Sequence, residues 1–230
     1  MNNPTSIMSE QAPQTTTTWS AVLFDLDGTL TDSAPGITTS LAGALAEIGH
    51  PVDDPSSLRV HVGPPLHETL RALGLSDDEA EAATVAYRSR ADLTDLQDNA
   101  VFPGMLGLLH SLREAGIPIG LATSKPTARA ARILEHFGLL PYFDVLGGSS
   151  DDRNSTKAQV IAWAIEQLAA GGVDTSRVVM VGDRGHDVLG AEANGIPSVI
   201  VEWGYGSPVE AVGAMAVVHS TDQLRGLLVR

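Results

Sequence analysis

Five short segments of this chain are apolar almost without interruption, and they constrain its fold more than any other feature. An alternation of apolar and polar residues would indicate strands with one face in water, whereas uninterrupted apolar runs are typical of strands buried on both faces. Such strands belong to parallel sheets that helices cover on both sides. The segments are SAVLFDL (20–26), IPIGLAT (117–123), FDVLGG (143–148), RVVMVGD (177–183) and PSVIVEW (197–203).

The interval between the first two segments follows a different pattern, because its apolar residues recur at helical spacing in GITTSLAGALAEIG, LHETLRALG and DDEAEAATVAYRSRADL. We therefore predict an α/β fold with a doubly wound parallel-sheet core, formed by residues 19–34 and 101–230. A small all-helical cap domain, residues 35–100, is inserted after the first strand. Residues 1–18 are polar and lack Lys and Arg, so we expect a disordered tail rather than a signal peptide.

The composition excludes several classes of function. The chain has 230 residues and a formal net charge of −14, which disfavours nucleic-acid binding because phosphates are neutralised by clustered Lys and Arg. It has no cysteine, so disulfides, thiolate metal sites and cysteine nucleophiles are excluded. No stretch reaches the roughly 18 apolar residues that a membrane span needs. We expect a cytoplasmic protein that binds neither nucleic acid nor membrane.

Polar residues of complementary chemistry stand at the ends of the apolar segments and at the start of a later helical pattern. Because ligands of doubly wound sheets bind outside the carboxyl ends of the strands, we expect these side chains at one edge. Converging carboxylates repel one another unless a cation is bound, and oxygen ligands without cysteine favour Mg²⁺ over zinc. A hydroxyl, backbone amides and a lysine complement phosphoryl oxygens. The residues are Asp25, Asp27, Thr123, Lys157, Asp183 and Asp187.

Four segments, in chain order, resemble the signature motifs of the haloacid dehalogenase (HAD) superfamily. They are DLDGTLTDS, LATSKP, TKAQVI and VGDRGHDVLGA, and the resemblance covers nearly the whole chain after Trp19. FPGMLGLLHSLREAGIPIGLATSKP and WGYG resemble the phosphoglycolate-phosphatase-like branch, whose helical cap follows the first motif. The resemblance implies a magnesium-dependent phosphatase that hydrolyses a small phosphomonoester through an aspartyl-phosphate. The dehalogenases lack the second aspartate, here Asp27, so its presence favours phosphoryl transfer.

The resemblance assigns roles to the acids at the strand ends. Asp25 matches the nucleophile that attacks phosphorus. Asp27 matches the general acid and base, which protonates the leaving oxygen and later deprotonates the hydrolytic water. In the family the backbone carbonyl of this residue also binds magnesium, and Asp183 matches a further carboxylate ligand. The implied metal ligands are therefore Asp25, Asp27 and Asp183.

The other matched residues bind the phosphoryl group or support those that do. Thr123 and the amide of Ser124 would hold a phosphoryl oxygen, and Lys157 would balance the charge of Asp25 and of the phosphoryl group. The implied catalytic set is thus the two acids of the first motif with Thr123 and Lys157. Asp187 is expected to orient Lys157 or a metal-bound water.

Each matched residue also has a purely structural interpretation. The paired acids could be turn residues, and Thr123 could cap the helix that follows it. Lys157 could be a solvated surface lysine, and Asp187 could belong to the first turn of a helix, where the dipole favours acids. The four motifs in order favour the catalytic interpretation for all of them.

Several residues near the motifs are open to interpretation. Lys125 is either a surface residue or faces the substrate, whereas Arg184 and His186 are expected to be solvated. WGYG is expected to form a loop near the site, with no chemistry assigned to it. Three cap residues are candidates for contact with the substrate, namely Arg59, His61 and His67.

Other activities remain open on the same scaffold. Nucleoside monophosphates, sugar phosphates and pyrophosphate are alternatives to phosphoglycolate as substrate, which would make the protein a 5'-nucleotidase or a pyrophosphatase. The chain also resembles an actinobacterial HAD-fold protein described as a protein-tyrosine kinase, although it has neither a Walker loop nor a kinase Gly-rich loop. A non-catalytic binding scaffold is disfavoured because every catalytic position is filled. The expected partner is a small phosphorylated metabolite, and the oligomeric state does not follow from the sequence.

Overall fold

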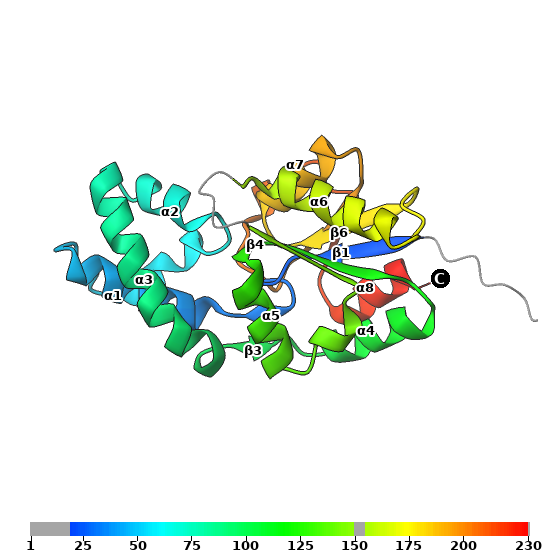
Figure 1. The fold of residues 1–230 in the computed structure, drawn as a ribbon, viewed down its shortest axis with the longest axis horizontal. Helices are drawn as coiled ribbons and strands as arrows, with labels where there is room; N and C mark the ends of the chain where they lie inside the picture. The colour runs from blue at the N-terminus through cyan, green and yellow to red at the C-terminus, as the bar shows by residue number, and fades with distance from the viewer. Residues whose placement is uncertain (1–18, 150–154, 230) are drawn as a thin grey trace, which may run out of the picture.

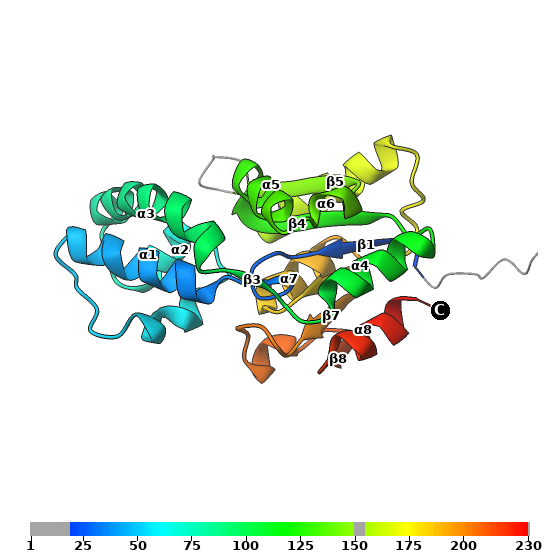
Figure 2. The same cartoon turned by 90° about the horizontal axis from the view of Figure 1, so that it is seen from below.

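A computed structural model of the chain describes residues 19–149 and 155–229, and the predicted tail of residues 1–18 lies outside that part. The strands of the main sheet are β1 (Ala21–Phe24), β4 (Ile119–Pro126), β5 (Val145–Ser149), β6 (Val178–Gly182), β7 (Ser198–Val201) and β8 (Ala216–Val218). Within the described residues they form one parallel sheet in the order β5-β4-β1-β6-β7-β8 (Figures 1 and 2). Strand β1 lies at its centre, with Val22 opposite Ile119 on one side and Val179 on the other.

Helices cover both faces of this sheet. They are α4 (Met105–Glu114), α5 (Thr127–His136), α6 (Lys157–Ala170), α7 (Gly185–Ala193) and α8 (Thr221–Leu228). Successive side chains of β1 point to opposite faces, so Val22 and Phe24 pack with α4, α5 and α8, whereas Ala21 and Leu23 pack with α6 and α7. All four side chains are fully buried, which explains why the strand is apolar without alternation. The predicted doubly wound α/β fold is confirmed.

A second group of helices follows the first strand and packs around a core of its own. It consists of α1 (Ala34–Glu47), the 3-10 helix η1 (Pro55–His61), α2 (Leu66–Ala72) and α3 (Asp77–Gln97). Leu41, Leu70 and Tyr87 belong to its buried cluster. We call this group the cap and the sheet with its helices the core; the two lie side by side in both ribbon views (Figures 1 and 2). The predicted domain limits, 19–34 with 101–230 and 35–100, stay a prediction.

Two chain crossings join the core to the cap. The strands β2 (Thr31–Asp32) and β3 (Ala100–Val101) pair there as a short antiparallel ribbon. The amide of Phe102 also donates a hydrogen bond to the carbonyl of Leu30 (3.0 Å), which holds the outgoing and returning segments together. The ribbon begins a few residues after β1, so the cap lies next to the carboxyl edge of the sheet. None of the described helices is long and apolar enough to cross a lipid bilayer.

Candidate active site

Asp25 and Asp27 follow directly after β1, at the edge where the parallel strands end. The amide of Asp25 donates to the carbonyl of Val181 in β6 (2.9 Å), which extends the strand pairing to the first acid. The turn that follows contains Gly28 with a φ of 85°, and a Cβ atom there would lie 2.3 Å from Oδ2 of Asp183. The backbone angle and the close approach therefore both require glycine. The turn leaves the two acids 3% and 8% exposed.

Lys157 connects three groups at this edge. Its Nζ lies 2.9 Å from Oδ1 of Asp25 and 2.8 Å from Oδ1 of Asp187, and it donates to the carbonyl of Ala122 at 3.0 Å. The lysine is 7% exposed and begins α6, whose amino terminus Thr156 closes with a capping box. The side chain is therefore held by its helix as well as by its partners, and it is not a solvated surface lysine.

The buried charges shift the pKa values of their neighbours. Burial raises the pKa of Asp25 and Lys157 lowers it, while Asp187 and Asp27 raise it again, so that it lies at about 6. Burial also raises the pKa of Asp183 well above its ordinary value, and the charges of Asp187 and Asp25 add to this. For Lys157, burial lowers the pKa, but the two carboxylates outweigh that effect and the net direction is upward. The lysine therefore stays cationic at neutral pH.

The acids at this edge form a site that fits a divalent cation. Oxygen atoms of Asp25, Asp183 and Asp187 all lie within 4.8 Å of one another, and the three side chains are buried. Lys157 pairs with Asp25 and with Asp187, and it is the one cation in these contacts, so the three carboxylates in their ionised form carry a surplus of negative charge. A hard divalent cation with oxygen ligands would offset that surplus, and the donor set contains oxygen atoms alone. The residues present therefore fit Mg²⁺.

The predicted metal ligands and the predicted orienting residue Asp187 differ in how strongly the chain already holds them. Asp183 accepts a hydrogen bond from the amide of Tyr205 at 2.7 Å. Asp187 accepts one from the amide of Arg184 at 3.1 Å, in addition to its contact with the lysine. This agrees with an orienting role for Asp187, which stays a prediction. The carboxylate of Asp27 is outside the group of three, and its predicted contact with the metal is through the backbone carbonyl, which also stays a prediction.

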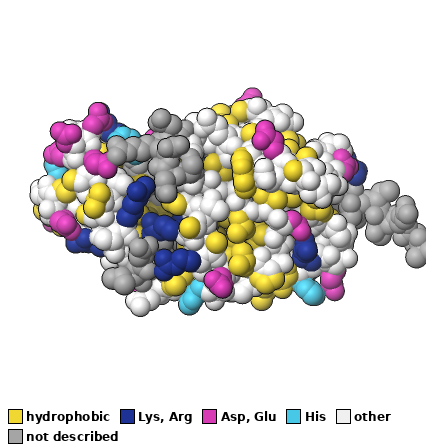
Figure 3. All heavy atoms as spheres, in the orientation of Figure 1, with side chains coloured by type: hydrophobic (Ala, Val, Ile, Leu, Met, Phe, Trp, Pro, Cys, Tyr) yellow, Lys and Arg dark blue, Asp and Glu magenta, His cyan; other side chains and the backbone are white. Residues whose placement is uncertain are grey.

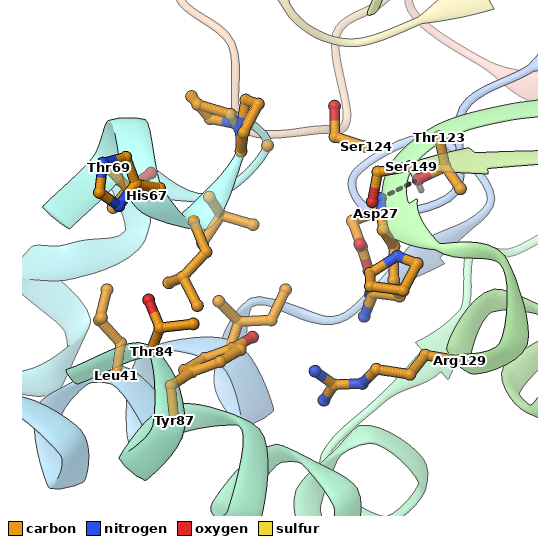
Figure 4. Close-up of a pocket in the computed structure, with 18 of the residues that line it drawn as sticks. Asp27, Leu41, His67, Thr69, Thr84, Tyr87, Thr123, Ser124, Arg129 and Ser149 are labelled. Carbon is orange, nitrogen blue, oxygen red and sulfur yellow. Dashed lines mark hydrogen bonds and ion pairs between the residues drawn. The ribbon is translucent and has the colours of Figure 1, made fainter. Parts of the chain in front are cut away.

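A cavity of about 270 Å³ lies between the core and the cap at this edge. Asp27, Thr123, Ser124 and Lys125 line its core side, and Figure 4 shows Asp27 close to Thr123 and Ser124. Nζ of Lys125 lies 3.2 Å from Oδ1 of Asp27, and the hydroxyl of Thr123 accepts a hydrogen bond from the Lys125 amide at 3.2 Å. The structure thus places the predicted phosphoryl-binding residues beside the predicted acid and base.

The cap supplies the other wall of the cavity. Leu41, His67 and Tyr87 lie there, and Arg129 of the core extends its guanidinium toward the Tyr87 ring, 5.7 Å from its centroid (Figure 4). Figure 3 shows Lys and Arg side chains gathered at the boundary between cap and core. In a chain of net charge −14, such a gathering would attract an anionic ligand to this place. The cations that line the cavity include Arg88, Lys125 and Arg129.

The three cap residues that are candidates for contact with the substrate differ in their positions. His61 and His67 line the cavity, as a contact with substrate would require. Arg59 lies elsewhere, with its guanidinium carbon 4.7 Å from the centroid of the Tyr205 ring. The expectation that it touches the substrate receives no support from this position.

Two residues within the motifs make more contacts than the sequence patterns indicated. Lys125 is 9% exposed and pairs with Asp27, so the open choice between surface and site is settled in favour of the site. The expectation of a solvated Arg184 is wrong, because its side chain is 12% exposed and its Nε lies 2.8 Å from Oε2 of Glu210. His186 is half-buried. The sequence indicated a role at the site only for Lys125, through its position inside LATSKP. The contacts of Arg184 join segments that are far apart in the chain, so no local pattern could indicate them.

Comparison with known proteins places these features in a family. A family model described as haloacid dehalogenase-like hydrolase matches residues 22–201. Over 213 residues the chain is 47% identical to the tyrosine-protein kinase PtkA of Mycobacterium tuberculosis, covering 90% of this chain and 72% of that protein. It is 38% identical over 192 residues to a 5'-nucleotidase of Pseudomonas aeruginosa, covering 82% and 85%. It is 36% identical over 209 residues to a phosphoglycolate phosphatase of Rhodospirillum rubrum, covering 86% of each.

The solved structures agree with these relatives. The crystal structure of a predicted phosphatase from Clostridium acetobutylicum superposes with a TM-score of 0.85 at 41% identity, covering 91% of this chain and 97% of that chain. The match spans both the sheet and the cap, so the arrangement of the two parts is shared and not particular to this chain.

Proposed function

The chain belongs to the haloacid dehalogenase-like hydrolases, in their phosphoglycolate-phosphatase-like branch, and from that premise we propose that it is a magnesium-dependent phosphatase of small phosphomonoesters. We further propose that its partner is a small phosphorylated metabolite and that it acts in the cytoplasm. The cavity of about 270 Å³ supports a small substrate, and the absence of cysteine from the sequence is compatible with a reducing compartment.

One observation carries the proposal: the two acids after β1 have different cationic partners at the floor of one cavity. Asp25 contacts Lys157 at 2.9 Å and shares it with Asp187, inside the group of carboxylates that fits a metal ion. Asp27 contacts Lys125 at 3.2 Å, on the side that faces the cavity. A nucleophile must be ionised and held still, whereas an acid and base must reach the leaving group. The two environments suit those two tasks.

The proposed reaction has two displacements at phosphorus. The Asp25 carboxylate attacks phosphorus and the bond to the leaving oxygen breaks, while Asp27 gives its proton to that oxygen. The product alcohol leaves and Asp25 carries the phosphoryl group. Asp27, now ionised, takes a proton from a water molecule whose oxygen attacks phosphorus, so that phosphate leaves, Asp25 is ionised again and Asp27 is protonated again. Every proton and bond is thereby accounted for within two residues.

The surrounding residues would hold the phosphoryl group during both displacements. Thr123 and the Ser124 amide would donate to one of its oxygens, and Lys157 would offset the charge that Asp25 and the phosphoryl group share. Asp25 and Asp183 with the Asp27 carbonyl would hold the metal ion. When bound, Mg²⁺ would supply the charge that lets an anionic carboxylate approach an anionic ester.

The test is the variant Asp25→Asn, assayed for release of phosphate from p-nitrophenyl phosphate with and without Mg²⁺. We expect wild-type activity to depend on Mg²⁺ and the variant to lose at least about 1,000-fold in kcat, because the covalent route is closed. Asp53→Asn, an isosteric change at an exposed cap position, is the matched control and should keep full activity. An Asp25→Asn protein that is folded and fully active would rule out the mechanism.

The identity of the leaving group is a finer proposal. Phosphoglycolate is the first candidate, because a phosphoglycolate phosphatase is 36% identical to this chain, and nucleoside monophosphates follow, because a 5'-nucleotidase is 38% identical. A screen of metabolite phosphates and pyrophosphate with the purified protein, in the presence and absence of Mg²⁺, ranks them by kcat/KM. A flat profile across all of them would contradict specificity for either class.

A second candidate function is transfer of the phosphoryl group to a protein hydroxyl. The observation in its favour is the 47% identity to PtkA, a protein named as a tyrosine kinase. The same Asp25 could carry a phosphoryl group taken from ATP and pass it to a tyrosine instead of water. Incubation with labelled ATP decides the matter, since this function requires label on protein tyrosine that disappears in Asp25→Asn.

A further inference from the structure

The segment WGYG after β7 packs directly on Asp183. The Tyr205 amide donates to Oδ2 of Asp183 at 2.7 Å. A Cβ atom on Gly204 would lie 2.4 Å from the same oxygen, and one on Gly206 would lie 2.0 Å from the Asp183 carbonyl oxygen. Both glycines are therefore required for the loop to approach this acid. The motif thus has a definite task, which is to hold one particular carboxylate.

The side chain of Tyr205 reaches from this loop to the crossing between core and cap. Its hydroxyl donates to Oδ1 of Asp32 (2.9 Å) and accepts from the amide of Ala34 (3.0 Å). Ala34 begins α1, so its amide has no partner inside the helix and is satisfied by the tyrosine instead. Burial raises the pKa of Tyr205, so the hydroxyl keeps its proton and remains a donor. One residue thus bonds Asp183 with its backbone and the entrance to the cap with its side chain.

A cation of the cap covers the same tyrosine. Arg59 of η1 places its guanidinium carbon 4.7 Å from the centroid of the Tyr205 ring, within the range of a cation–π contact. Its NH1 atom also lies 3.9 Å from Oδ1 of Asp32, the acceptor of the tyrosine hydroxyl. The cap, the crossing segment and the WGYG loop therefore meet at one side chain.

A parallel contact begins at the residue that follows Asp183 in the chain. The guanidinium of Arg184 donates to the carbonyl oxygens of Val60 (3.3 Å) and Val62 in the cap. Glu210 of the core holds the same side chain through Nε at 2.8 Å. Movement of the cap away from the core would break these bonds together with the Arg59 contact. Both links between cap and core on this side thus lead back to Asp183.

We propose that Tyr205 is a positioning residue that couples the carboxylate geometry of Asp183 to the docked position of the cap. The inference rests on the proposed function, in which Asp183 is a metal ligand. A cation at Asp183 and a docked cap would order the same loop, so each would favour the other by the same factor. Tyr205 provides the link, and Arg59 is its partner in the cap.

The variant Tyr205→Phe tests the link, because it keeps the ring and the amide but removes the hydroxyl bonds to Asp32 and Ala34. We expect calorimetric titration with MgCl₂ to show binding about threefold to tenfold weaker than wild type, which corresponds to part of the contribution of the two lost hydrogen bonds. Tyr142→Phe, at a half-buried core position outside this network, is the matched control and should bind Mg²⁺ normally.

Arg59→Gln tests the cap side of the link and should weaken Mg²⁺ binding in the same direction, although the contacts of this residue are with Tyr205 and Asp32 and not with Asp183. Arg71→Gln is its matched control, because the two arginine side chains are 46% and 47% exposed and both belong to the cap. Arg71→Gln should leave the Mg²⁺ titration unchanged. An equal effect of both substitutions would assign the loss to general weakening of the cap and would overturn the proposal.

Amide hydrogen exchange supplies a readout that a merely structural role would not move. In the wild type, MgCl₂ should slow exchange in segment 31–37, which contains Asp32 and Ala34, and in Tyr205→Phe it should have no such effect. Equal protection by Mg²⁺ in both proteins, or equal Mg²⁺ affinity, would overturn the coupling. Neither measurement involves turnover, so the coupling and the proposed function can fail independently. A protein that shows the coupling but hydrolyses no phosphomonoester would refute the proposed function and leave the coupling standing.

Discussion

Replacing Asp25 with asparagine is expected to stabilise the magnesium-free protein at neutral pH while it abolishes turnover. Burial, opposed by Lys157, raises the pKa of Asp25 from 3.8 to about 6. A carboxyl with a higher pKa in the folded state than in the unfolded state binds its proton more tightly when folded, so stability falls as the pH rises through this window. The difference between 3.8 and 6, at about 1.36 kcal/mol per pKa unit, corresponds to about 3 kcal/mol lost by pH 7.

Asparagine avoids this loss because it does not ionise. It has nearly the size of aspartate, and Lys157 keeps its contacts with Asp187 (2.8 Å) and with the carbonyl of Ala122 (3.0 Å). The lysine therefore stays paired when the charge of Asp25 is removed. The free energy of unfolding of the variant, minus that of wild type, should increase by up to about 3 kcal/mol between pH 4 and pH 7.

The measurement is urea unfolding in EDTA at a series of pH values, followed by far-ultraviolet circular dichroism. Equal m-values in the two proteins would show that the folded and unfolded states expose similar surface. Added MgCl₂ should reduce the gap, because a cation that binds the folded wild type raises its stability. An unfolding free energy of Asp25→Asn that is equal to or below that of wild type at pH 7, with no dependence on pH, would refute the reasoning.

A substitution that is expected to change the unfolding free energy in the opposite direction serves as the control. The exposed Asp54 accepts hydrogen bonds from the side chain and the amide of Ser56, and these lower its pKa. A carboxyl with a lowered folded pKa contributes stability above its unfolded value of 3.8, and that contribution is lost as the pH falls. Asp54→Asn should therefore destabilise the protein at neutral pH and have less effect in acid. The two variants together test, within one chain, whether a raised and a lowered pKa change the stability in opposite directions as the pH rises.

Two further perturbations follow from the site. Asp27→Asn should reduce kcat more for alkyl phosphates than for p-nitrophenyl phosphate, since a good leaving group needs less protonation; equal losses on both substrates would count against an acid role. Gly204→Ala should lower the Tm and the calorimetric Mg²⁺ affinity, because the new Cβ would lie 2.4 Å from Oδ2 of Asp183. Gly226→Ala in α8 is the control: its new Cβ would meet nothing within 4 Å, so this substitution should raise the stability of the protein by about 0.5–1 kcal/mol. An unchanged Mg²⁺ affinity in Gly204→Ala would contradict the close packing of that loop.

The fold could be predicted because burial on both faces of the sheet leaves a direct mark on the sequence. The fully buried residues of β1 alternate between two helical layers, so neither face tolerates polar side chains. The cap could be predicted for the converse reason, since its helices have one buried face and their apolar residues recur at helical spacing. The strand β8 was not predicted, because its three residues, Ala216–Val218, are too few to show a period.

The carboxylate group at the site could be predicted from position alone. Parallel strands end at one edge, so acids that follow β1 and β6 come together whatever loops intervene. The contacts of Arg184 and Tyr205 could not be predicted in this way. The Tyr205 hydroxyl meets the Ala34 amide across 171 residues, and a local pattern carries no information on such a pairing. These contacts depend on how the loops after different strands pack, which is fixed only in the folded protein.

The charges at the floor and at the walls of the cavity have opposite effects on an anionic ester. The carboxylates at the floor of the cavity and directly behind it carry more negative charge than Lys157 offsets, because Asp25, which lines the cavity, shares this lysine with Asp187, and Asp183 belongs to the same group of acids. The cavity walls include cations such as Arg129, which attract an anion toward this floor. An anionic ester would thus be drawn in at the walls and repelled at the carboxylates. It follows that the surplus charge on the floor must be offset before the Asp25 carboxylate comes within bonding distance of phosphorus, and that binding of the cation and binding of the ester favour one another.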